Sequence, residues 1–83
     1  MHLTQRVLEL LSSAPDQPTI ELHVQPDDVP DGFLMPLWVT PTTQQTIARA
    51  LAERSNVVDV IVHVPGWGAA HFDMPDRTAL AQL

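Results

Sequence analysis

The sequence contains no cysteine, no lysine and no tyrosine, and these absences exclude several kinds of chemistry. Without cysteine there is no disulfide framework, no thiolate metal ligand and no cysteine nucleophile. Without lysine there is no Schiff-base residue and no phosphate-binding lysine of the Walker type. Glycine occurs only three times, and no Gly-x-Gly-x-x-Gly or Gly-x-Ser-x-Gly motif is present. We therefore expect no catalytic residue of these common types.

Basic residues are also scarce, since four arginines are the only permanent cations against ten acidic residues. The resulting net charge is −6. Nucleic-acid binding needs clustered arginine and lysine, so we predict no direct binding of nucleic acid. An acidic surface instead suits solubility, a basic protein partner or mimicry of a polyanion.

Length and hydropathy predict a small globular protein. The 83 residues suffice for one domain, spanning residues 1–83, and a hydrophobic content of 45% allows a buried core. The apolar stretch Leu3–Leu11 is too short to cross a bilayer and contains charged residues. We expect a cytoplasmic protein with no membrane partner.

Hydrophobic periodicity divides the chain into seven elements, in the order α-β-β-α-β-β-α. Apolar residues at helical spacing predict helices near both ends and a third helix that begins near Pro41. Thr40 is the expected N-cap of this third helix, and Thr42 with Gln45 forms a competing capping box. Strict alternation predicts strands, most clearly in the valine-rich segment 57–64. The predicted helices cover residues 1–14, 41–54 and 75–83, and the predicted strands cover residues 18–25, 33–39, 57–64 and 69–73.

Two of these strands have one apolar and one polar face, which is typical of a sheet covered by helices on one side only. We therefore predict an α+β fold, a two-layer α/β sandwich. Its sheet is expected to be four-stranded and mostly antiparallel, with the helices on one face.

The segment Phe33–Val39 is the most informative, because it is apolar on both faces if extended. Pro36 at its centre cannot donate a ladder hydrogen bond, so this strand should lie at an edge of the sheet or contain a bulge. An exposed apolar edge is normally covered, and a second copy of the chain or another protein would cover it. We predict partner contacts from Phe33, Leu34, Met35 and Trp38.

Trp67, in a predicted turn, is a further candidate contact, because tryptophan is enriched at interface hot spots. Local packing over the hairpin explains it about as well. Three acidic residues in one turn, Asp27, Asp28 and Asp31, would attract a basic partner. These residues do not form a calcium loop of the EF-hand type, because Val29 and Trp38 occupy ligand positions.

The remaining candidate functional residues lie on the polar faces of the strands. If the register places His63 opposite His71, histidines and carboxylates converge on the open face of the sheet. Such a set would suit zinc or another divalent transition metal, or acid–base catalysis. A solvated polar face without a ligand explains the same pattern more simply. The candidate ligands are His23, His63, His71, Asp59 and Asp73.

The sequence favours a small acidic, non-enzymatic protein-binding module, such as a regulator, an inhibitor or an accessory subunit. It would need no cofactor and would associate with itself as a homodimer or with a protein partner. One alternative is a metal-binding protein or a His/Asp-based enzyme that uses the polar sheet face. Another is an inhibitor that mimics nucleic acid.

Overall fold

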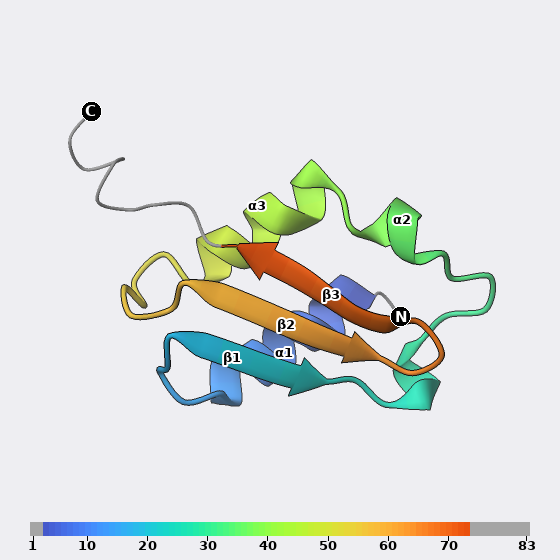
Figure 1. Cartoon of the computed structure of the whole chain (residues 1–83), viewed down its shortest axis with the longest axis horizontal. Helices are drawn as coiled ribbons and strands as arrows, with labels where there is room; N and C mark the ends of the chain where they lie inside the picture. Colours follow the sequence, from blue (N-terminus) through green and yellow to red (C-terminus); the bar gives the residue numbers. More distant parts are fainter. Residues whose placement is uncertain (1–2, 74–83) are drawn as a thin grey trace.

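The computed structural model of the chain describes residues 3–73, which form helices on one side of a small sheet (Figure 1). The predicted C-terminal helix lies outside the described residues. Within residues 3–73, no helix is long and apolar enough to cross a membrane. In chain order, the elements are α1 (Leu3–Ser13), β1 (Thr19–His23), the 3₁₀ turn η1 (Pro26–Asp28), α2 (Met35–Trp38), α3 (Pro41–Ala50), β2 (Asp59–Val64) and β3 (Gly68–Asp73).

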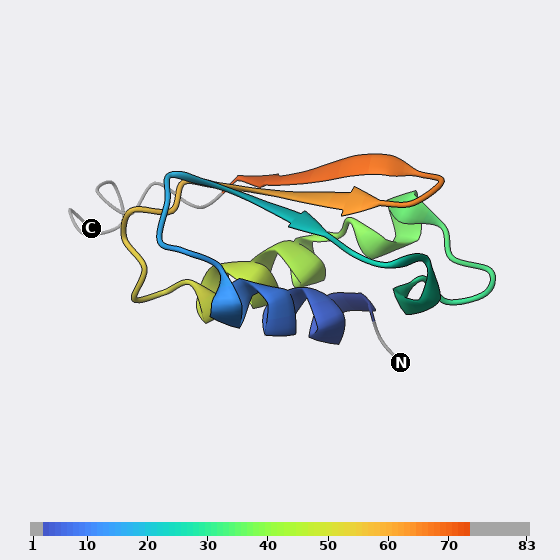
Figure 2. The same cartoon turned by 90° about the horizontal axis from the view of Figure 1, so that it is seen from below.

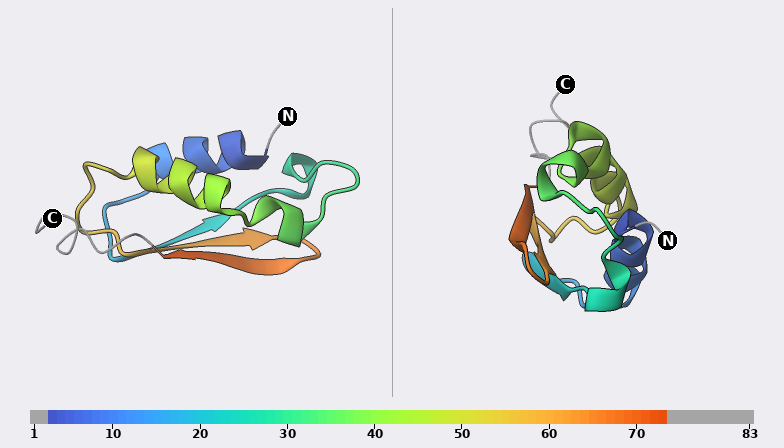
Figure 3. Two further views of the ribbon diagram at one scale, coloured as in Figure 1. Left: turned by 90° about the horizontal axis from the view of Figure 1, so that it is seen from above. Right: turned by 90° about the vertical axis from the view of Figure 1, so that its right-hand side faces the viewer.

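The helices cover one face of the sheet, as predicted, and leave the other face open (Figures 2 and 3). In α1 the buried residues Leu3, Val7 and Leu11 recur every four residues, so one stripe of the helix faces the sheet. The strands meet this stripe with alternate residues, such as Ile20 and Leu22 in β1. The core therefore lies between the two layers. It comprises Leu3, Val7, Leu11, Ile20, Leu22, Val24, Ile47, Leu51, Val57, Val60, Val62, Val64, Ala70 and Phe72.

The sheet has three strands in the order β1-β2-β3, so the prediction of four strands is wrong. The prediction of a mostly antiparallel sheet is also wrong, because β1 pairs with β2 in parallel and only the β2–β3 pair is antiparallel. Parallel neighbours need a long crossover, and the segment containing α2 and α3 supplies it. The crossover places β2 in the middle of the sheet and β1 at one edge.

The predicted strand 33–39 is the wrong assignment that led to the extra strand. Here the chain forms the short helix α2, in which Pro36 lies within the first two positions. The first turn of a helix needs no hydrogen bond from that nitrogen, whereas a sheet ladder does. The apolar residues of this segment therefore project around a helical turn instead of toward two faces of a strand.

The N-terminus of α3 confirms the predicted cap. Thr40 is extended, and its side chain accepts a hydrogen bond from the backbone N–H of Thr43. Replacing Thr40 with alanine is expected to lower the free energy of unfolding by about 1 kcal/mol, because this N–H loses its partner. Thr42, the alternative cap, is exposed, and Thr42→Ala should change stability by less than about 0.5 kcal/mol. Urea unfolding of both variants measures the difference, and equal effects would contradict the assignment of the cap.

Candidate functional site

Three aromatic rings from distant parts of the chain meet beside α2 and the β2–β3 turn. The rings of Phe33 and Trp67 are edge to face with centroids 5.5 Å apart, and those of Phe33 and Trp38 are 6.1 Å apart. Trp38 in turn packs edge to face on the buried Phe72, at 5.4 Å. The indole N–H of Trp38 donates a hydrogen bond to Thr4 Oγ1 at 2.9 Å. These contacts connect the surface aromatics to the core.

Several large apolar side chains beside these rings are exposed to solvent. Leu37 is 74% exposed, Leu34 is 50% exposed and Trp67 is 42% exposed. A hollow of about 400 Å³ lies beside Leu34 and Leu37, lined by Leu3, Thr4, Pro30, Gly32, Phe33, Leu34, Leu37 and Trp38. We call Phe33, Leu34, Leu37, Trp38 and Trp67 the apolar end.

The residues predicted to contact a partner differ in how far they are exposed to solvent. Leu34 and Trp67 are exposed, whereas Phe33, Met35 and Trp38 are partly buried and pack against the core. Leu37 was missed, although it is the most exposed large apolar residue within residues 3–73. A helical assignment separates Leu37 from Met35, because residues two apart share a face in a strand but not in a helix.

The three aspartates of the neighbouring loop also differ. Asp27 and Asp31 are exposed, and neither forms an ion pair within residues 3–73. Asp28 is held in place, because its Oδ2 lies 3.4 Å from Arg6 Nε and accepts a hydrogen bond from the backbone N–H of Gln25 at 3.0 Å. The hydrogen bond of Arg6 to Glu9, together with the charge of Asp28, raises the pKa of the Arg6 guanidinium. Asp27 and Asp31 are thus the aspartates of this loop available to a partner.

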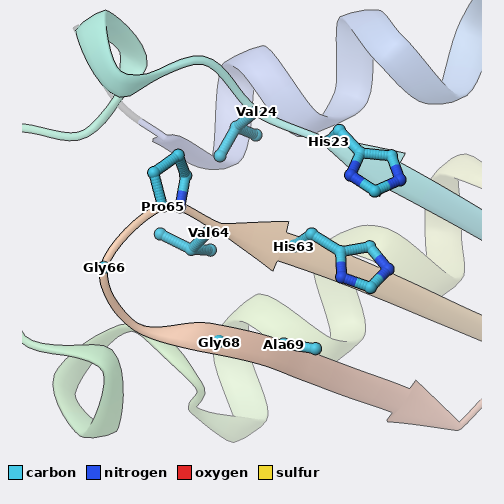
Figure 4. Close-up of a pocket in the computed structure, with 8 residues that line it drawn as sticks. All are labelled: His23, Val24, His63, Val64, Pro65, Gly66, Gly68 and Ala69. Atoms are coloured by element: carbon cyan, nitrogen blue, oxygen red, sulfur yellow. The ribbon is translucent and has the colours of Figure 1, made fainter.

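The open face of the sheet brings together two of the predicted histidines. His23 and His63 are direct neighbours in the parallel register, and their rings stack with centroids 4.3 Å apart and planes inclined by 5° (Figure 4). His63 Nε2 lies 3.0 Å from Glu21 Oε1. Glu21 had not been singled out as a partner of His63, because that pairing depends on β1 lying parallel to β2. Beside the two rings is a shallow hollow of about 550 Å³, lined by His23, Val24, His63, Val64, Pro65, Gly66, Gly68 and Ala69.

The other candidate ligands lie on the same face but apart from this pair. His71 is opposite Ile61, and Ala69 occupies the position opposite His63 that the sequence interpretation gave to His71. Asp59 and Asp73 are opposite one another at the far end of the β2–β3 ladder, and the buried Asp59 Oδ1 has no hydrogen-bond partner among residues 3–73. No group of three or more potential metal ligands occurs within residues 3–73. The metal and acid–base interpretations remain predictions.

Comparison with known proteins adds no family to this description. No family model, no curated protein and no solved structure matches the chain.

Proposed function

We propose that the protein is a small, non-enzymatic protein-binding module whose apolar end contacts its partner. The observation that carries the proposal is the joint exposure of Leu34 and Leu37 at a hollow and of Trp67, whose ring packs on Phe33 in the lining of that hollow. Apolar side chains grouped in this way favour contact with another protein surface. Leu34, Leu37 and Trp67 are the anchors, and the surrounding residues exclude water from them.

The contacts among the aromatic residues of the apolar end support this role. Trp38 is held between Phe72 and Thr4, and Phe33 is held between the two tryptophans. A surface that is already ordered loses little conformational entropy when it binds. More of the energy from apolar burial is then available for affinity.

The charges beside the apolar end define the kind of partner. Asp27 and Asp31 are exposed and lack ion pairs within the described part of the chain. Together with the net charge of −6, they favour a partner with basic residues around an apolar centre. Such charges mainly raise the association rate and exclude acidic competitors.

A pull-down from the native lysate with the full chain tests the proposal. The double variant Leu34→Ser, Leu37→Ser is expected to weaken capture of the partner roughly ten-fold or more, since each change removes an apolar anchor. Val58 is a matched control, because it is 58% exposed and lies just before β2, at the opposite end of that strand from the β2–β3 turn. Val58→Ser should capture the same proteins as the wild type.

Two results would contradict the proposal. One is undiminished capture by the double variant, and the other is an equal loss with Val58→Ser. Circular dichroism of each variant establishes that the fold is retained.

A further inference from the structure

The outer edge of β1 offers a second binding surface, distinct from the apolar end. β1 is an edge strand, paired only with β2 among the described elements (Figure 1). The carbonyl of Pro18 accepts hydrogen bonds from Val58 and Asp59, and the N–H of Val24 donates to His63. Because backbone direction alternates along a strand, Thr19, Glu21 and His23 point their N–H and C=O groups away from the sheet.

This edge lacks three of the features that commonly prevent strand addition. No lysine, proline or bulge interrupts Thr19–His23. The opposite edge of the sheet differs, because the side chain of Gln44 in α3 donates a hydrogen bond to the carbonyl of Asp73 in β3. Within residues 3–73, that contact covers the end of the β3 edge, and no such side-chain contact is made to the backbone of β1.

The charges on β1 identify the strand that would complement it. Glu21 and His23 lie two residues apart on the open face. In an antiparallel pair of two β1 strands whose two-fold axis passes at Leu22, Glu21 of each copy is opposite His23 of the other. Shifting the axis to Glu21 would instead place two glutamates side by side, which is unfavourable. Glu21 uses Oε1 for His63, and its other carboxylate oxygen has no hydrogen bond within residues 3–73.

We propose that a second copy of this chain binds along the β1 edge, in antiparallel register with Glu21 opposite His23. The sheets of the two copies then form one continuous sheet with all helices on the same face. This inference rests on the proposed function only in that the chain acts through protein contacts. The surface is separate from the apolar end, so either proposal can fail without the other.

Sedimentation equilibrium of the full chain tests the association. Glu21→Gln is expected to raise the dimer dissociation constant about 2- to 30-fold, because the carboxylate of both symmetric Glu21–His23 pairs is lost. The double variant Glu21→His, His23→Glu restores the pairing in exchanged positions and should recover most of the affinity. Asp73→Asn is a matched control that removes a carboxylate from the same face at the other edge, and it should have no effect.

Cross-linking tests the register directly, because the chain contains no natural cysteine. A Glu21→Cys copy mixed with a His23→Cys copy should form a mixed disulfide, since opposed hydrogen-bonded residues have Cα atoms about 5.5 Å apart. This mixed pair also retains one Glu21–His23 contact.

Several results would overturn the proposal. In the sedimentation experiment, these are a monomeric wild-type chain, tighter association of Glu21→Gln, and failure of the double variant Glu21→His, His23→Glu to recover affinity. In the cross-linking experiment, it is a disulfide that forms preferentially between two copies of the same cysteine variant. Loss of dimerisation in the Leu34→Ser, Leu37→Ser variant with an intact β1 edge would show that copies associate through the apolar end instead.

Discussion

Replacing Phe72 with alanine is expected to destabilise the protein by about 3–5 kcal/mol, because the change removes a whole buried ring and leaves a cavity. Phe72 is 1% exposed and lies in β3, between the sheet and the helical layer. Domains of this size are only marginally stable, so the loss would be a large part of the total. Urea unfolding followed by circular dichroism measures the effect.

Phe72→Ala is also expected to alter the apolar end. Trp38 packs edge to face on this ring, so its removal deprives Trp38 of its support in the core. The tryptophan fluorescence of the folded variant should therefore shift as Trp38 becomes more hydrated. Phe72→Leu leaves a smaller cavity and should cost less than Phe72→Ala. A loss below about 1 kcal/mol for the alanine variant would contradict the described packing.

The second large effect is expected at Arg54, where Arg54→Met should lower the free energy of unfolding by about 2–3 kcal/mol. The guanidinium of Arg54 donates hydrogen bonds to the carbonyls of Leu11 and Ala14, at 2.8 and 2.6 Å. These carbonyls lie at the C-terminal end of α1, where helix carbonyls lack partners and a positive charge is favourable. Through these hydrogen bonds, Arg54 links the segment after α3 to the C-terminal end of α1.

Two further variants separate the contributions of Arg54. Its ion pair with Asp16 at 3.2 Å is largely exposed, so Asp16→Asn should cost less than about 1 kcal/mol. Arg54→Lys keeps the charge but loses the planar fork, so it should recover only part of the stability. Chemical denaturation of the three variants gives the comparison. Equal stability of Arg54→Met and Asp16→Asn would mean that the carbonyl hydrogen bonds contribute nothing.

Elements with a regular hydrophobic period were predicted well from the sequence. The helix expected over residues 1–14 is observed over Leu3–Ser13, and the strand expected over residues 57–64 is observed over Asp59–Val64. The strand expected over residues 18–25 corresponds to Thr19–His23. These predictions succeed because burial of one face repeats with the period of the element itself.

The segment around Pro36 could not be assigned in the same way. It is apolar at almost every position, so neither a helical nor a strand period is visible. The proline was interpreted as a defect in a strand, whereas it suits the first turn of α2. This single error produced the fourth strand and the antiparallel sheet, and it concealed Leu37 as an exposed residue.

The amino-acid sequence by itself determined the period of each regular element, the apolar stripe of α1, the polar face of the sheet and the acidic charge. Only the tertiary structure decided that β1 lies parallel to β2, that His23 stacks on His63 beside Glu21, and that Phe33, Trp38 and Trp67 meet at one end. The physical reason is that periodicity reports which side of an element is buried, whereas register and connection depend on contacts between residues far apart in the chain. Both proposed binding surfaces are products of those distant contacts.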